Sequence, residues 1–82
     1  MAVRIVLPNG ETTTFTYATS AVSSGGYVGI FEWNDQTKDL EEIASLPFDA
    51  FKRIEVIKDR VVLQTISGRA SRLPDPSNQP TV

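Results

Sequence analysis

Serine and threonine hydroxyls are the groups in this chain that could act as nucleophiles in acyl transfer, because the sequence contains neither cysteine nor histidine. Acyl transfer by such a hydroxyl would need a neighbouring lysine that acts as its base. Most of these residues fall in expected loops or in the segment 11–17, where threonine is an ordinary strand residue. The sequence therefore predicts no activated nucleophile, and we expect that the protein is not an enzyme.

Carboxylates are the second possible source of chemistry. Glu41 and Glu42 are adjacent, so their side chains point to opposite faces of a strand and also diverge on a helix. Asp35 and Asp39 flank an expected turn and lack the spacing of a recognised calcium loop. Without cysteine and histidine, the usual ligands of zinc, copper and haem are missing as well. We expect no metal, no cofactor and no small-molecule substrate.

The segment 23–26, Ser-Ser-Gly-Gly, is superficially similar to a phosphate-binding loop. Such loops direct their amides toward a phosphate at the start of a following helix, whereas a strand is expected to follow here. A flexible loop is therefore the favoured interpretation.

Three aromatic residues, Tyr27, Phe31 and Trp33, alternate along one face of an expected strand. Exposed strand aromatics can stack on nucleic-acid bases, whereas a small domain needs most of its aromatic residues inside. A net charge of −2 and a sequence pI near 4.9 also argue against a polyanion-binding protein. A nucleic-acid-binding small β-barrel is kept as an alternative, and its contacts would be Tyr27, Phe31 and Trp33 with the cations Lys52, Arg53 and Arg60.

Residues 54–66 predict a β-hairpin, because two β-branched runs flank the charged pair Lys58 and Asp59. A two-residue loop at that pair would place the apolar side chains on one face. The expected partners are Val56 with Val61 and Ile54 with Leu63.

A second hairpin is predicted for residues 3–17, around Pro-Asn-Gly at 8–10. Proline favours the first position of a type I turn, and glycine suits the left-handed position of a three-residue loop. The expected partners are Val3 with Phe15 and Ile5 with Thr13.

The middle of the chain predicts a strand at 27–33 that is apolar on both faces and therefore central. Residues 18–26 are small and polar, which indicates a long connection. The spacing within 39–46 fits a strand that pairs with 27–33, although a helix is also compatible. Residues 47–51 suggest a single helical turn whose aromatic side chains close one end of the core.

The predicted fold class is all-β, with residues 1–66 forming one domain of five or six short antiparallel strands in a meander. The strands would form a barrel or a compact sandwich of the size of an SH3 module, a comparison of size and strand count only. Residues 67–82 contain three prolines and predict an extended C-terminal arm.

The predicted function is that of a non-enzymatic protein–protein interaction or assembly module, such as a structural accessory, decoration or cement protein, with a virion as one setting. Its partner would be a protein, either another copy of the chain or a larger assembly. Candidate contacts on faces turned away from the predicted core are Val6, Ile57, Val62 and Ile66. Candidate contacts on the arm are Arg69, Arg72, Leu73 and Pro74.

The third possible function is that of a small acidic regulator or inhibitor of a larger enzyme, of the kind that phages encode, which presents the segment 32–42 to a basic site.

The N-terminus lacks a hydrophobic segment long enough for a signal peptide, and no apolar run is long enough to span a bilayer. The expected location is the cytoplasm, of the cell or of a host, or a virion, with no membrane contact. The identity of the partner, the oligomeric state and the source are left open.

Overall fold

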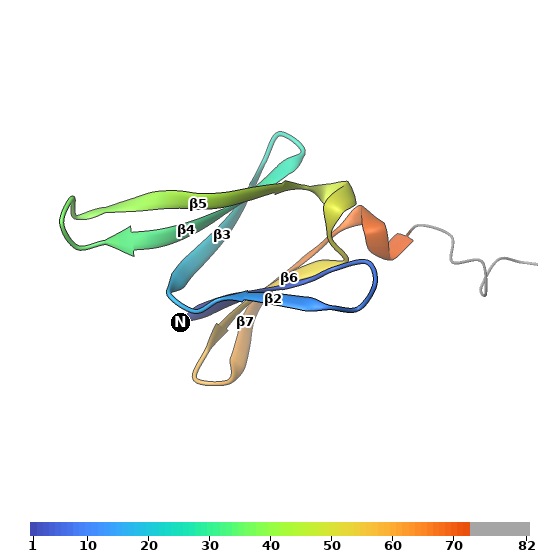
Figure 1. Cartoon of the computed structure of the whole chain (residues 1–82), viewed down its shortest axis with the longest axis horizontal. Coiled ribbons are helices and arrows are strands. Elements are labelled where there is room, and N and C mark those ends of the chain that lie inside the picture. Colours follow the sequence, from blue (N-terminus) through green and yellow to red (C-terminus); the bar gives the residue numbers. More distant parts are fainter. Residues whose placement is uncertain (73–82) are drawn as a thin grey trace, which may run out of the picture.

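The computed structural model describes residues 1–72, which form seven strands and two 3-10 turns (Figure 1). The all-β antiparallel class is confirmed, with seven strands in place of the expected five or six. The strands are β1 (Ala2–Val6), β2 (Thr12–Phe15), β3 (Ala18–Ser24), β4 (Tyr27–Asn34), β5 (Asp39–Pro47), β6 (Arg53–Lys58) and β7 (Val61–Ser67), and the turns are η1 (Phe48–Ala50) and η2 (Arg69–Arg72).

The strands form two sheets. Sheet A has the order β2-β1-β6-β7 and sheet B has the order β3-β4-β5. Sheet B is a meander as expected, whereas sheet A pairs the first strand of the chain with β6. The sheets meet where β3 lies against β1 and β6. Within residues 1–72 they do not close into a barrel, so the barrel alternative is wrong and the protein is a two-layer β structure.

The core lies between the two sheets and consists mainly of aliphatic side chains. Its members are Val3, Ile5, Ala18, Ala21, Val28, Ile30, Phe51, Ile54 and Val56. The small side chains of Ala18 and Ala21 on β3 allow sheet B to approach sheet A closely. Phe51, which is 0% exposed, is the largest side chain of this core.

The first hairpin has the predicted loop and register. Gly10 has a φ of 90°, and its amide donates to the carbonyl oxygen of Leu7 at 2.9 Å. Val3 is opposite Phe15, and Ile5 is opposite Thr13. The turn preferences of proline and glycine were therefore sufficient to fix this pairing.

The β6–β7 hairpin has a different register from the predicted one. Its two-residue loop is Asp59 and Arg60, with φ values of 52° and 68°. Positive φ at both positions is the conformation that matches the twist of the flanking strands. A β-bulge then adds one residue to β7, and beyond this bulge the apolar side chains of the two strands pair again, so that Ile54 faces Ile66. The expected partners Val56 with Val61 and Ile54 with Leu63 are wrong, because the extra residue in β7 could not be seen in the alternation.

The segment 18–26 is a strand and a tight turn, and the predicted long connection is wrong. β3 pairs along its length with β4, and Gly25 and Gly26 make the turn between them with φ values of 59° and 89°. β4 is central, as predicted. Residues 39–46 belong to the strand β5, which excludes the helical alternative.

The helical turn predicted at 47–51 is present as η1, and the rings of Phe48 and Phe51 are 5.6 Å apart. The end of the described chain differs from the expected extended arm, since β7 continues to Ser67 and η2 packs on η1. Leu73, Pro74 and the rest of the predicted arm lie outside the described residues. Neither 3-10 turn in residues 1–72 has the length or apolar character of a membrane-crossing helix.

Candidate functional site

One face of sheet B points away from the core, and we call it the sheet B outer face. Alternation along β4 separates Tyr27, Phe31 and Trp33 from the inward-facing Val28 and Ile30, which are both 0% exposed. The register adds side chains from both neighbouring strands. The face consists of Val22 from β3, Tyr27, Gly29, Phe31 and Trp33 from β4, and Leu40, Glu42 and Ser45 from β5.

Large apolar side chains on this face are open to solvent. The exposed fractions are 51% for Val22, 54% for Tyr27, 46% for Trp33 and 45% for Leu40, and Phe31 is partly buried. The expectation that a small domain places most of its aromatic residues inside is therefore wrong for Tyr27 and Trp33. Valine, isoleucine and alanine together with Phe51 already fill the space between the sheets.

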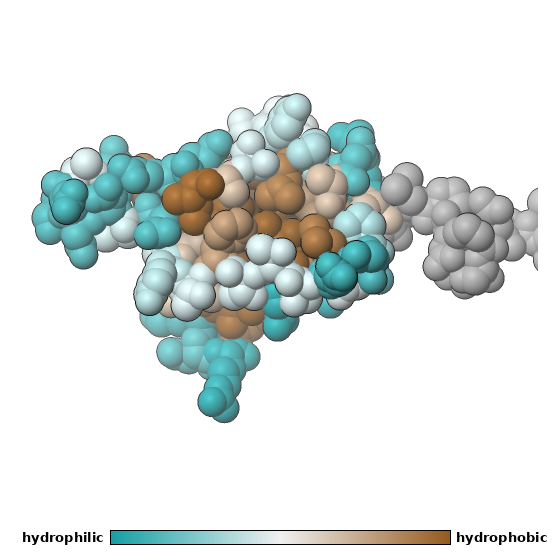
Figure 2. Space-filling model, viewed as in Figure 1, coloured by the Kyte–Doolittle hydropathy of each residue, from teal (hydrophilic) through white to brown (hydrophobic). Residues whose placement is uncertain are grey.

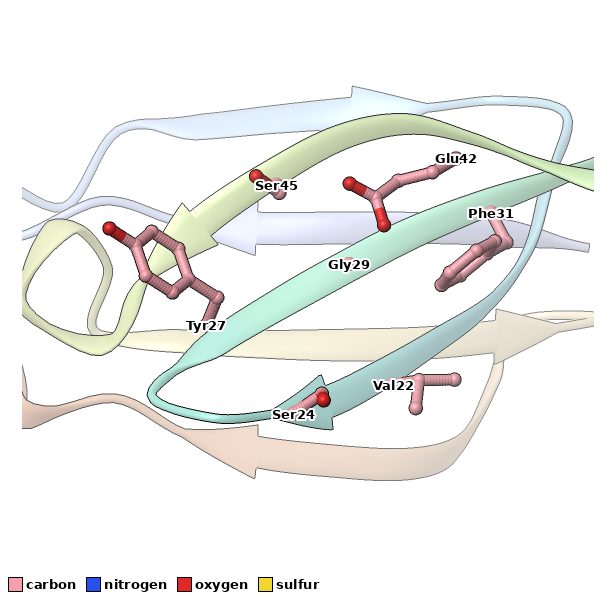
Figure 3. A pocket seen from close by; sticks show the side chains of 7 residues that line it. All are labelled: Val22, Ser24, Tyr27, Gly29, Phe31, Glu42 and Ser45. Atoms are coloured by element: carbon pink, nitrogen blue, oxygen red, sulfur yellow. The ribbon is translucent and has the colours of Figure 1, made fainter.

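A shallow hollow of about 420 Å³ lies in the middle of the sheet B outer face, between the rings of Tyr27 and Phe31 (Figure 3). Gly29 lies at its centre, and the carboxylate of Glu42 extends over that glycine. A Cβ added to Gly29 would lie 2.9 Å from Phe31 Cε1 and 2.9 Å from Glu42 Oε2. The missing side chain is thus what allows Phe31 and Glu42 to cover the backbone of β4.

The electrostatic character of sheet B is acidic. Its three strands contain Glu32, Asp39, Glu41 and Glu42 and no lysine or arginine. The β4–β5 hairpin extends beyond the body of the molecule (Figure 1), and its end is hydrophilic (Figure 2). Any ligand of this sheet must therefore tolerate or neutralise negative charge.

Hydrogen bonds hold the end of this hairpin in one conformation. Trp33 Nε1 donates to Asp35 Oδ1 at 3.0 Å, and Asn34 Nδ2 donates to Glu41 Oε1 at 2.8 Å. The amide of Leu40 donates to Asp39 Oδ1 at 2.8 Å. These carboxylates therefore serve the turn itself, and residues 1–72 contain no cluster of three or more acidic side chains that could hold a metal ion.

The cations of the nucleic-acid alternative are not on the face that carries the aromatic residues. Lys52 immediately precedes β6, Arg53 is the first residue of β6, and Arg60 lies in the turn between β6 and β7, so all three lie in or next to the strands of sheet A. The structure does not bring these cations together with Tyr27, Phe31 and Trp33. A strand of nucleic acid stacked on Phe31 would meet the carboxylate of Glu42. Near Trp33 it would meet Lys38, whose Nζ lies 3.9 Å from Asp35 Oδ1, the oxygen that also accepts from Trp33 Nε1.

The predicted protein contacts on sheet A differ in their exposure to solvent. Val6 is only 6% exposed, so its predicted place on a free outward surface is wrong: it is covered. Ile66 packs partly against the core, which contradicts its predicted outward orientation. Ile57 is half-buried opposite Val62, which is 42% exposed, and the partner contacts of this pair stay a prediction.

The predicted arm contacts begin in a folded segment. Arg69 Nε is 3.9 Å from Asp49 Oδ1, and the Arg69 guanidinium lies 5.9 Å from the centre of the Phe48 ring. Arg72 is the last residue of η2. Arg69 thus helps to attach η2 to η1 and is not part of a free arm.

Comparison of the chain with protein-family models, curated proteins and solved structures gives no match. The sheet B outer face must therefore be interpreted from its own geometry.

Sequence reasoning missed Val22, Leu40 and Glu42 as members of this face. Val22 was assigned to a loop, and the β-bulge in the β4–β5 pair hid the position of Glu42. The four-residue turn between Asn34 and Asp39 contained a usable signal, since a closed hairpin places the large apolar residues Trp33 and Leu40 side by side.

Proposed function

We propose that this protein is a non-enzymatic interaction module that assembles with a protein partner through the sheet B outer face. One observation carries the proposal: Val22, Tyr27, Trp33 and Leu40 lie on the same face of a folded sheet and are each 45–54% exposed. Clustered exposed apolar side chains mark interaction sites, and tyrosine and tryptophan are enriched in the cores of protein interfaces. A structural accessory or cement protein, of a virion for example, would work in this way.

The chemistry of the face supports a protein partner over a nucleic acid. The hollow offers an apolar surface, the carboxylate of Glu42 and the hydroxyl of Ser45. Phosphate groups would be repelled by this carboxylate, whereas an arginine or lysine on a protein surface would pair with it. The partner therefore presents an apolar surface that includes at least one basic side chain opposite Glu42.

A photo-crosslinking amino acid placed at Val22 or at Leu40 tests this proposal in cells that express the protein. Both side chains are exposed, so the substitution leaves the core intact. We expect both positions to crosslink to the same protein. Tyr17, which is 77% exposed and lies outside the face, is the matched control position and should not give this product.

A second variant shows whether the crosslink depends on the face itself. Phe31→Ser removes the ring beside the hollow and should reduce the crosslink from Leu40 strongly, with the circular-dichroism spectrum unchanged. The proposal fails if positions 22 and 40 give no common protein product, if Tyr17 gives the same product, or if the product is nucleic acid.

The projecting β4–β5 hairpin favours a second candidate function, that of an acidic regulator that occupies a basic site of an enzyme. Glu41 and Glu42 distinguish the two functions, because their side chains lie on opposite faces of β5. Contact through the sheet B outer face predicts that Glu42→Lys weakens the complex and Glu41→Lys does not. Insertion of the whole hairpin into a basic site predicts that either substitution abolishes binding.

A further inference from the structure

The open edge of sheet A at β7 is a second uncovered surface, separate from the sheet B outer face. β7 is seven residues long and carries no charged side chain. Val61, Val62 and Leu63 are 58%, 42% and 56% exposed. Within residues 1–72 the strand pairs with β6 on one side only.

The other edge strands carry features that discourage strand pairing between molecules. β2 has only four residues, and β5 carries three carboxylates and ends at Pro47. β3 is irregular near its start, and Val22 is its one bulky apolar side chain. Short length, charge, proline and bulges are the means by which natural sheets protect their edges. β7 has a bulge but neither charge nor proline, and its exposed end is apolar.

The free main-chain groups of β7 can be assigned from the hairpin geometry. Lys58 and Val61 close a two-residue turn and form a hydrogen-bonded pair, so the amide and carbonyl of Val62 point to the open side. Past the bulge, alternation directs the same groups of Thr65 outward. The bond from Gly68 N to Lys52 O, 2.9 Å long, fits this alternation.

We propose that β7 pairs in the antiparallel direction with β7 of a second copy of this chain. A twofold axis would then join the two A sheets into one continuous sheet. The strand suits a second copy because it contains no charge that its own duplicate would repel, and because Val62 and Leu63 would gain apolar neighbours on the opposite strand. This inference goes beyond the proposed function and uses none of the residues of the sheet B outer face.

The expected dimer is weak and depends on concentration. One strand pair buries less surface than the roughly 1,200 Å² at which stable interfaces begin. We therefore expect a dissociation constant of the dimer in the micromolar to millimolar range. Sedimentation equilibrium of the full chain over that concentration range measures this dissociation constant directly.

Two kinds of variant test the edge. Leu63→Lys adds a charge to an exposed position and should weaken the dimer at least about tenfold. Tyr17→Lys makes a similar change at an exposed position outside both β7 and the sheet B outer face and should leave the dissociation constant unchanged. Thr65→Pro removes an outward-pointing amide that an edge strand can lose and should prevent pairing, whereas Thr65→Val should not.

Hydrogen exchange of the full chain identifies what covers the edge. We expect the amides of Val62 and Thr65 to exchange rapidly in dilute solution and to gain protection as the dimer forms. Protection of both amides in the monomer would mean that another part of the same chain covers β7, and this would overturn the proposal. A chain that remains monomeric at millimolar concentration, or a dimer that Tyr17→Lys breaks and Leu63→Lys does not, would also overturn it. The crosslinking at positions 22 and 40 is unaffected by these outcomes, so the two proposals can fail separately.

Discussion

Gly68 lies directly against Phe51, whose carbonyl oxygen and ring occupy the space that a side chain at position 68 would need. The amide of Gly68 also donates to the carbonyl oxygen of Lys52 at 2.9 Å. This contact fixes the end of β7 to the segment that enters β6, close to the place where η1 and η2 meet. The fully buried Phe51 is therefore held on one side by the backbone that directly follows the last strand.

Gly68→Ala should destabilise the protein by about 1–3 kcal/mol, the usual cost of overpacking. The obstacle includes the backbone of Phe51, which cannot rotate away as a side chain can. The free energy of unfolding in urea measures the effect. An unchanged unfolding midpoint would mean that Gly68 does not contact Phe51 in solution.

Gly29→Ala is the matched substitution, and we expect it to change stability by less than about 1 kcal/mol. The atoms that a Cβ would meet are the edge of the Phe31 ring and the Glu42 carboxylate, which can both move outward into solvent. That movement alters the hollow, so crosslinking from Leu40 should decrease while the fold is retained. A loss of stability as large as that of Gly68→Ala would show that Phe31 and Glu42 are held rigidly.

The ion pair between Arg4 and Glu55 predicts an asymmetry between its two members. Arg4 Nε and Nη2 are each 2.8 Å from Glu55 Oε1, and the side chains are 40% and 11% exposed, respectively. Arg53 Nε is more distant, at 3.7 Å from Glu55 Oε2. Removing arginine leaves a nearly buried carboxylate with one long contact, whereas removing the carboxylate leaves an arginine that water can still reach.

We therefore expect Arg4→Ala to cost about 1–3 kcal/mol of unfolding free energy, and Glu55→Gln to cost less. Glutamine is the suitable replacement because it keeps the size of the side chain and an oxygen that can accept from Arg4. Urea titrations of both variants give the comparison. Equal costs would indicate that Glu55 is more hydrated than its position between β1 and β7 implies.

The sequence was sufficient where a residue type determines a backbone conformation. Pro8 and Gly10 each have a strong preference at one position of a three-residue loop, and the observed pairing of Val3 with Phe15 follows from them. Alternation also assigned Tyr27, Phe31 and Trp33 correctly to one face of β4. These features depend on residues that are neighbours in the chain.

Features that depend on the rest of the fold could not be predicted in this way. Alternation states which side chains share a face, but it does not state which face another sheet covers, so the exposure of Tyr27 and Trp33 was not determined. β3 was missed because alanine and serine have weak strand preferences, and its pairing with β4 decides its conformation.

The loop of the β6–β7 hairpin offers a test in which the sign of the stability change separates two registers. Arg60 has a φ of 68°, which costs a residue with a side chain about 1 kcal/mol or more. Replacing Asp59 by Asn and Arg60 by Gly gives the pair preferred in this type of turn, so the double variant should be more stable by about 0.5–1 kcal/mol. If the loop were instead at Lys58 and Asp59, position 60 would be an extended strand residue. Glycine there would destabilise the protein by about 0.5–1 kcal/mol. Thermal and urea unfolding of the double variant measure the sign, and a decrease in stability would contradict the observed turn.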